Sequence, residues 1–235
     1  MISPQLHFIL TKSIISYMNA LILLFYRIVA FFTRVPRETI HKHTLLFDEK
    51  FSERDITQGK YINNQGAFFD FPYGYGNVGL NGCGPIAVFN ALVALNEINV
   101  INVEKKEIYN HFIKILEYFE KNGAALKGRF GTSPISIRYY LKKNGFETKA
   151  YSKKSTSKLN DFSDNYHAFI SIIYNDAKDI RRGLHFICTK KNEDGTFTSH
   201  NPEYTGNSLF EALNQCSSHE VRHVYTIGIK KREAI

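Results

Sequence analysis

Residues 81–92 read NGCGPIAVFNAL and set Cys83 between two glycines at the start of an apolar run. The periodicity of this run, with Pro85 near its beginning, predicts a helix over residues 85–97. A cysteine at the amino end of a helix meets free N–H groups and the positive end of the helix dipole, and both favour the nucleophilic thiolate. The sequence therefore indicates Cys83 as a nucleophile, with a small buried cysteine as the alternative.

The two glycines beside the cysteine bear on the same chemistry. Because Gly82 and Gly84 carry no side chains, we expect a substrate carbonyl to approach the sulfur between them. Backbone N–H groups at the helix start can donate to the oxyanion that forms when a thiolate attacks. No G-x-S-x-G serine elbow occurs in the sequence, which weakens a serine hydrolase hypothesis.

A nucleophilic cysteine needs a base, and the base needs a group that orients it. His185 opens a predicted strand over residues 184–190, and a second predicted strand, residues 196–200, follows after an Asp-Gly turn. Pairing of the two strands as a hairpin brings His185 and Asn201 close across its open end. We therefore predict His185 as the base and Asn201 as the residue that orients it, although Asn-Pro is also a common turn.

Periodicity places helices first and strands afterwards along the rest of the chain. Helical spacing with end signals predicts further helices over residues 104–121, 132–144 and 208–215. Apolar runs and alternation predict further strands over residues 146–151, 167–174 and 222–230. Helices followed by antiparallel strands make an α+β domain.

The order of these motifs resembles the papain-like cysteine peptidases. The chain is most similar to the bacterial double-glycine leader peptidases, which trim bacteriocin precursors, and to their stand-alone relatives. The resemblance covers about residues 70–230 and is carried by NGCGPIAVFNAL, GTSPISIRYYLKKNGFETKAY and GLHFICTKKNEDGTFTSHNPEY. It implies a papain-like fold, with helices packed on an antiparallel sheet, and a triad of Cys83, His185 and Asn201 that cleaves a peptide bond.

The same resemblance implies an oxyanion side chain, usually Gln, six residues before the cysteine. Asn77 stands at that position here, and its amide donates the same N–H but reaches less far. Asn81 is the rival donor. Transporter-linked members of the family carry membrane and ATPase domains, whereas this sequence contains no G-x-x-x-x-G-K-[ST] motif, so we expect the stand-alone form.

The chain is basic, with a formal net charge of +8. Its basic residues are scattered through amphipathic segments, and no zinc-finger spacing, Arg-rich helix or aromatic–basic RNA motif occurs. We therefore expect a solvated basic surface and no nucleic-acid partner. A nucleic-acid or lipid-surface protein stays as a third hypothesis, which rests on the charge alone.

The remaining cysteines and histidines give weaker signals. Three cysteines without a C-x-x-C motif make neither a disulfide framework nor a zinc site, which favours a reducing compartment. Cys188 lies on the predicted strand of His185 and is expected in the core. Cys216, His219 and His223 offer no fourth ligand, so we expect no metal, and no organic cofactor is implied. His167 opens an apolar strand and is the rival base.

An apolar segment occupies residues 8–33, with a narrow polar stripe. It suits a membrane anchor, a helix lying on a membrane surface, or a helix packed on the domain or a partner. Three basic residues follow it, Arg34, Arg37 and Lys42, whereas only Lys12 lies near its start. If the segment spans a membrane, this asymmetry predicts that the following domain is cytoplasmic. The predicted organisation is a hydrophobic helix (1–33), a linker or wrapping segment (34–65) and a papain-like domain (66–235).

The sequence as a whole predicts a cysteine peptidase, either a thiol hydrolase or a related acyl transferase. Its substrate is expected to be a peptide or protein, and the resemblance implies a leader or processing role. The alternative is a catalytically degenerate papain-like module that binds peptides at the membrane without cutting them. Cys83, His185 and Asn201 are the residue types that such a catalytic triad uses, which favours the enzyme over the binding module.

Overall fold

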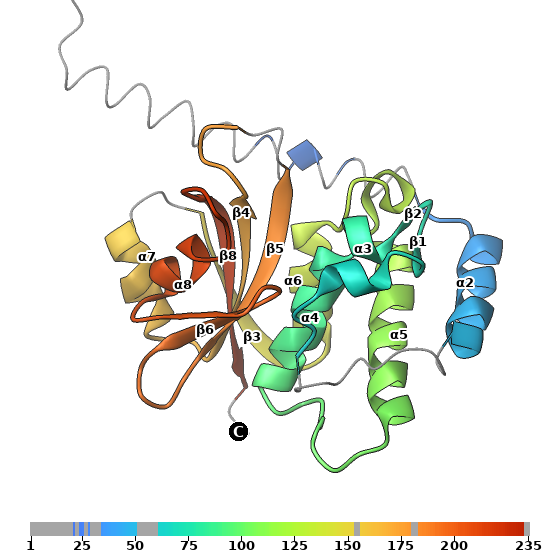
Figure 1. Cartoon of the computed structure of the whole chain (residues 1–235), viewed down its shortest axis with the longest axis horizontal. Coiled ribbons are helices and arrows are strands. Elements are labelled where there is room, and N and C mark those ends of the chain that lie inside the picture. The colour runs from blue at the N-terminus through green and yellow to red at the C-terminus, as the bar shows by residue number, and fades with distance from the viewer. Residues whose placement is uncertain are drawn as a thin grey trace, which may run out of the picture.

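The structure is a computed structural model that describes most of the chain from residue 34 onward. The described residues are Leu21, Leu24, Phe25, Ile28, 34–50, 61–152, 156–179 and 183–232. Within them the chain forms three layers, in which a sheet lies between a larger and a smaller group of helices (Figure 1).

Six antiparallel strands form the central layer, in the order β3-β8-β4-β5-β6-β7. Their bounds are β3 (Phe146–Tyr151), β4 (Ala168–Tyr174), β5 (Leu184–Lys191), β6 (Phe197–His200), β7 (Tyr204–Gly206) and β8 (Arg222–Lys231). β4 is buried along its whole length, which explains its continuous apolar sequence. β5 and β6 pair as the predicted hairpin, with Cys188 opposite His200. The predicted α+β class is confirmed.

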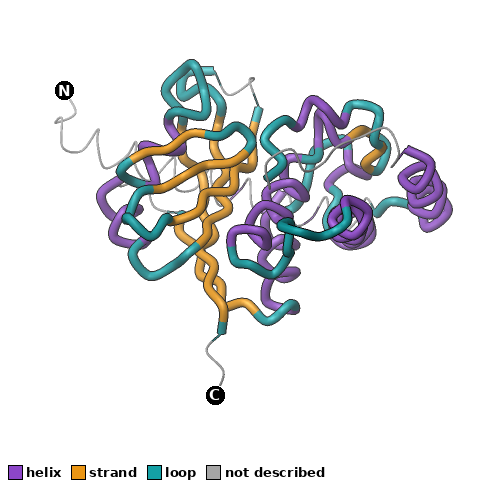
Figure 2. The backbone as a smooth tube through the Cα atoms, turned by 60° about the horizontal axis from the view of Figure 1, so that its bottom comes forward, coloured by secondary structure: helices purple, strands orange, loops and turns teal. Residues whose placement is uncertain are grey.

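The larger group of helices packs on one face of this sheet, as Figure 2 shows. Its members are α2 (Arg37–Lys50), α3 (Val78–Asn81), α4 (Cys83–Ala94), α5 (Lys105–Asn122) and α6 (Pro134–Lys143), with the 3-10 turns η2 (Gln65–Phe68) and η3 (Ala125–Gly128) and the small hairpin β1 (Pro72–Tyr73) and β2 (Gly76–Asn77). α4 is buried nearly all round because it lies against both the sheet and α5. α5 is amphipathic and turns Phe112, Leu116 and Phe119 inward.

The opposite face of the sheet is covered by α7 (Thr156–Ser163) and α8 (Leu209–Asn214). Each face therefore has its own apolar cluster. The larger one joins the sheet to α4 and α5 and includes Phe112 and Ile227. The smaller one joins the sheet to α7 and α8 and includes Phe169 and Leu213. Burial of one such side chain contributes about 2 kcal/mol to stability, so both clusters hold the sheet rigid beneath the helices.

The segments before residue 66 are those for which the sequence predicted least of the structure. The expected apolar helix of residues 8–33 falls outside the described residues except for four positions, and it stays a prediction. None of the described helices is long and apolar enough to cross a membrane. The polar stretch 34–65, expected as a linker or wrapping segment, contains α2, which its weak periodicity did not indicate. The sequence pattern also gave no signal for β7 or α7.

Candidate active site

Cys83 and His185 both line one cleft. Cys83 is the first residue of α4 and His185 the second of β5, and these two elements lie side by side in Figure 1. The cleft has a volume of about 350 Å³ and is lined by Leu80, Asn81, Cys83, Arg129, Phe130, Gly131, Asn175, Gly183, Leu184, His185 and Phe186. Both residues line this cleft because α4 packs directly against β5. The predicted nucleophile and the predicted base are therefore brought together by tertiary packing.

Close packing around α3 sets the position of Cys83. A Cβ on Gly82 would lie 2.6 Å from the side chain of Val78, and a Cβ on Gly84 would lie 2.6 Å from the Cβ of Thr132. Both glycines thus allow the backbone of the helix start to approach its neighbours. The sequence predicted that the two glycines let a substrate carbonyl approach the sulfur, whereas the structure gives them a packing role.

Burial is the largest cause of the pKa shifts of both Cys83 and His185. It raises the pKa of the Cys83 thiol, and backbone hydrogen bonds from Phe186 and Gly84 offset part of that rise. It lowers the pKa of His185, and the hydrogen bond to the backbone of Asn201 offsets part of that fall. The resting pair is therefore a thiol and a neutral imidazole. The expectation that the helix start alone favours the thiolate is corrected, because Cys83 is only 6% exposed.

Asn201 contacts His185 through its backbone carbonyl. His185 Nε2 donates to the Asn201 oxygen at 2.8 Å. A carbonyl only accepts, so in the neutral ring Nε2 carries the proton and Nδ1 keeps the lone pair that a general base uses. Asn201 thus lies where the sequence predicted, but its side chain does not make the contact.

The side chain of Asn201 is hydrogen-bonded to Gln65, a residue that the sequence did not indicate. Asn201 Nδ2 donates to Gln65 Oε1 at 3.1 Å, and the Gln65 backbone N–H donates to Asn201 Oδ1 at 3.1 Å. Gln65 Nε2 also donates to the carbonyl of Gly79 in α3, at 2.9 Å. Gln65 therefore connects the segment before Cys83 with the residue that orients His185. Nothing in the local sequence marked it, since it stands in a polar stretch without periodicity.

The two predicted oxyanion residues are placed differently. Asn77 caps α3, and its Oδ1 accepts from the backbone N–H of Leu80 at 2.8 Å. Asn77 is not among the described residues that line the cleft, whereas Asn81 is. A Cβ on Gly76 would lie 2.4 Å from Asn81 Nδ2, so the glycine makes room for this amide. Of the two, only Asn81 is among the described residues that line the cleft.

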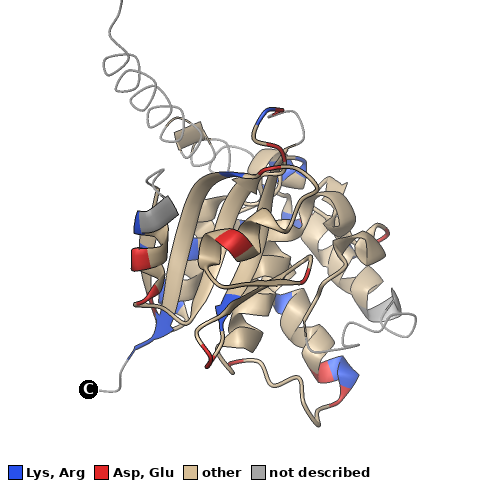
Figure 3. Ribbon diagram, turned by 60° about the vertical axis from the view of Figure 1, so that its left-hand side comes forward, with Lys and Arg blue, Asp and Glu red and all other residues tan. Residues whose placement is uncertain are grey.

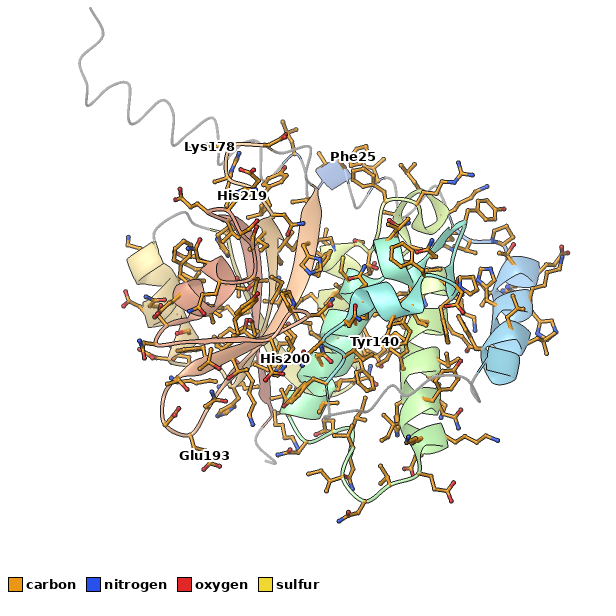
Figure 4. All side chains as sticks on the ribbon, in the orientation of Figure 1. Phe25, Tyr140, Lys178, Glu193, His200 and His219 are labelled. Carbon is orange, nitrogen blue, oxygen red and sulfur yellow. The ribbon has the colours of Figure 1, made fainter. Side chains whose placement is uncertain are left out.

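None of the other candidates is among the described residues that line the cleft. His167 is exposed and absent from the cleft lining. Cys188 is buried in the core as expected, and burial raises its pKa. The sulfur of Cys216 donates to Ser199 Oγ and Ala212 O, while His223 Nε2 bonds to Thr226 Oγ1. Figure 4 shows His219 at the end of the sheet away from His200. In the described parts of the chain, no group of three or more His, Cys, Asp or Glu residues is placed to hold a metal.

No model of a known protein family matches the chain, and no curated protein matches it. Among solved structures, the chain is similar to the peptidase domain of Streptococcus ComA, described as a bifunctional ABC transporter involved in a quorum-sensing pathway. The two share 18% sequence identity, with 65% of this chain and 93% of that domain covered and a TM-score of 0.40.

Proposed function

We propose that this chain is a papain-like cysteine peptidase of the double-glycine leader peptidase type, which cleaves peptide bonds with Cys83 and His185. The observation that carries the proposal is that both residues line one cleft, with His185 Nε2 hydrogen-bonded to a backbone carbonyl. That bond presents Nδ1 as the base. No metal or organic cofactor enters the chemistry.

The first half of the reaction forms an acyl enzyme. His185 Nδ1 takes the proton from the Cys83 sulfur, and the thiolate attacks the substrate carbonyl carbon. The Asn81 amide and the backbone N–H of Cys83 hold the oxyanion. The imidazolium then gives its proton to the leaving amine, the C–N bond breaks, and a thioester remains.

The second half releases the acyl group. His185 accepts a proton from water, the hydroxide attacks the thioester, and the Cys83 thiol and a carboxylic acid are formed. The carbonyl of Asn201 holds the ring in place throughout, and its partial negative charge stabilises the imidazolium. An amine in place of water makes the same site an acyl transferase.

A randomised synthetic peptide library, read by mass spectrometry, tests this proposal. Wild-type protein is expected to cut a subset of the peptides, whereas Cys83→Ala and His185→Ala cut none. Cys216→Ser is the matched control, because this second cysteine lies outside the cleft lining, and it should retain the wild-type cuts. Cleavage that persists in Cys83→Ala contradicts the mechanism.

The low exposure of Cys83 favours a second candidate, a peptide-binding module that does not cut. Only 6% of the residue is accessible, and its raised pKa keeps the thiol protonated. The library experiment separates the two functions. A module retains peptides without cleaving them, and Cys83→Ala leaves that retention unchanged.

For location we propose the cytoplasmic side of a membrane, with contact through residues 8–33. The support is the apolar sequence of this segment and the cluster Arg34, Arg37 and Lys42 that follows it. Flotation with vesicles of mixed neutral and anionic phospholipids is expected to recover the full chain but not a variant that lacks residues 1–33. Equal recovery of both rejects the proposal.

A further inference from the structure

The rim of the cleft opposite β5 is formed by the turn that follows α5 and contributes Arg129 and Phe130. Leu126 and Lys127 adopt left-handed conformations, with φ of 47° and 55°. Gly128 follows with φ of 89°, and a Cβ there would lie 2.4 Å from the carbonyl oxygen of Tyr73. These three consecutive residues reverse the chain and point it back toward the cleft.

Backbone hydrogen bonds hold this turn against its neighbours. Tyr75 N donates to Lys127 O at 2.6 Å, and Phe130 N donates to Ala125 O at 3.1 Å. Ala125 N closes the turn by donating to Gly131 O at 2.9 Å. Arg129 and Phe130 therefore sit on a fixed support, although both side chains are exposed.

Among the described residues that line the cleft, Arg129 is the one with a side chain of fixed charge, and none is Asp or Glu. Within the part of the chain that the structure describes, the only partner of its guanidinium is the ring of Tyr75, at 6.0 Å, which Lys127 also approaches at 5.1 Å. Arg138, by contrast, donates to the hydroxyl and the carbonyl of Thr148. The five N–H donors of Arg129 thus have no acceptor among the described residues.

One acidic residue, Asp176, is adjacent in sequence to the cleft lining, and no contact joins it to Arg129. Asp176 follows the lining residue Asn175, but its Oδ1 accepts from the backbone N–H groups of Lys178 and Asp179 and closes its own turn. Over the ribbon as a whole, acidic and basic positions are interspersed, as Figure 3 shows for one side. The positive character of the cleft rim is therefore local.

Resting on the proposed function, we infer that the peptide substrate carries a carboxylate side chain, Asp or Glu, within about two residues of the scissile bond, bound by Arg129. A cleft of about 350 Å³ is on the order of 7 Å across, which is roughly two residues of an extended peptide. A carboxylate accepts two parallel N–H bonds from a guanidinium. Leu80 and Phe130, 63% and 47% exposed, offer apolar contacts to the neighbouring substrate side chain.

The test repeats the randomised peptide library with four proteins: wild type, Arg129→Gln, Arg129→Glu and Lys127→Gln. Wild-type cleavage sites are expected to be enriched in Asp or Glu within two residues, with kcat/KM about 10- to 100-fold above matched Asn or Gln peptides. Arg129→Gln should lose this enrichment, and Arg129→Glu should prefer Lys or Arg instead. Lys127→Gln is the matched control, because Lys127 contacts the same ring but does not line the cleft, and it should keep the wild-type preference.

The outcomes separate this inference from the proposed function. Wild-type cleavage without acidic enrichment, or enrichment that survives in Arg129→Gln, overturns the inference and leaves the peptidase intact. Loss of enrichment in Lys127→Gln as well as in Arg129→Gln overturns the assignment to Arg129. Absence of any cleavage by wild-type protein overturns both.

Discussion

Burial acts on Cys83 and His185 in opposite directions, and the pH dependence follows from it. The pKa of His185 is held below its ordinary value of 6.5, so the neutral base persists below that pH. The pKa of Cys83 is held above its ordinary value of 9.0, so the free thiolate forms only above that pH. We expect kcat/KM for a cleaved peptide to fall only below pH 6.5, and iodoacetamide labelling of Cys83 to rise only above pH 9.

Labelling of a His185→Ala variant provides the control for this prediction. If Cys83 and His185 are both uncharged at rest, wild type and His185→Ala should show the same labelling of Cys83 as a function of pH. A rapid labelling plateau between pH 4 and 8 that disappears in the variant would show a preformed ion pair instead.

Gln65 is expected to act on the reaction through Asn201, without touching the substrate. Gln65→Leu removes the acceptor of Asn201 Nδ2 and the donor to the Gly79 carbonyl, so kcat should fall about 10- to 100-fold with little change in KM. The hydrogen bond that His185 donates to the Asn201 carbonyl raises the pKa of His185. Weakening that bond should therefore move the acid limb of kcat/KM to lower pH.

Two variants separate positioning from general loss of structure. Gln65→Glu keeps an acceptor for Asn201 Nδ2 but cannot donate to Gly79, so it should recover part of the lost kcat. Gln215→Leu removes another Gln that donates to a backbone carbonyl, that of Thr205, outside the cleft lining. It should leave both kcat and the acid limb unchanged. An unmoved acid limb in Gln65→Leu counts against the positioning role.

At the scale of elements, the amino end of α4 depends on its contact with Thr132. A Cβ on Gly84 would lie 2.6 Å from Thr132 Cβ, and Thr132 Oγ1 is bound to the Tyr73 hydroxyl at 2.7 Å, so neither neighbour can give way cheaply. Gly84→Ala is expected to lower the free energy of unfolding by about 1–3 kcal/mol in a urea titration. Gly66→Ala is the control, because its Cβ would meet mainly the exposed side chain of Asn64, and an equal loss there would argue against the packing explanation.

At the scale of the whole molecule, Glu120 joins three distant parts of the chain. Its Oε1 accepts from the backbone N–H of Gly74 and lies 2.6 Å from His43 Nδ1, so α2 and the β1–β2 hairpin are both held to α5. The residue is buried, with 1% exposure. Glu120→Ala is expected to cost about 3 kcal/mol of unfolding free energy, measured in urea.

Glu117→Ala is the matched control for this prediction, because Glu117 lies one helical turn earlier and accepts from Thr44 at a half-buried position. It should cost about 1 kcal/mol. Equal costs for the two variants would mean that the buried carboxylate does not hold these elements together.

Local patterns in the sequence determined most of the elements. The predicted strand 146–151 is β3, the predicted helix 104–121 is α5 displaced by one residue at each end, and the hairpin of β5 and β6 forms as expected. These predictions succeed because side-chain periodicity and turn residues act within a few positions along the chain. The placement of Cys83 at a helix start follows from the same local information.

Only the tertiary structure decided what the site residues do. In the fold, β8 lies between β3 and β4, Asn81 rather than Asn77 lines the cleft, and Gln65 is hydrogen-bonded to Asn201. The tertiary structure also raised the pKa of Cys83, against the effect of the helix start. Burial and hydrogen bonds between residues far apart in sequence depend on which surfaces meet, and no periodicity within a single segment encodes that meeting.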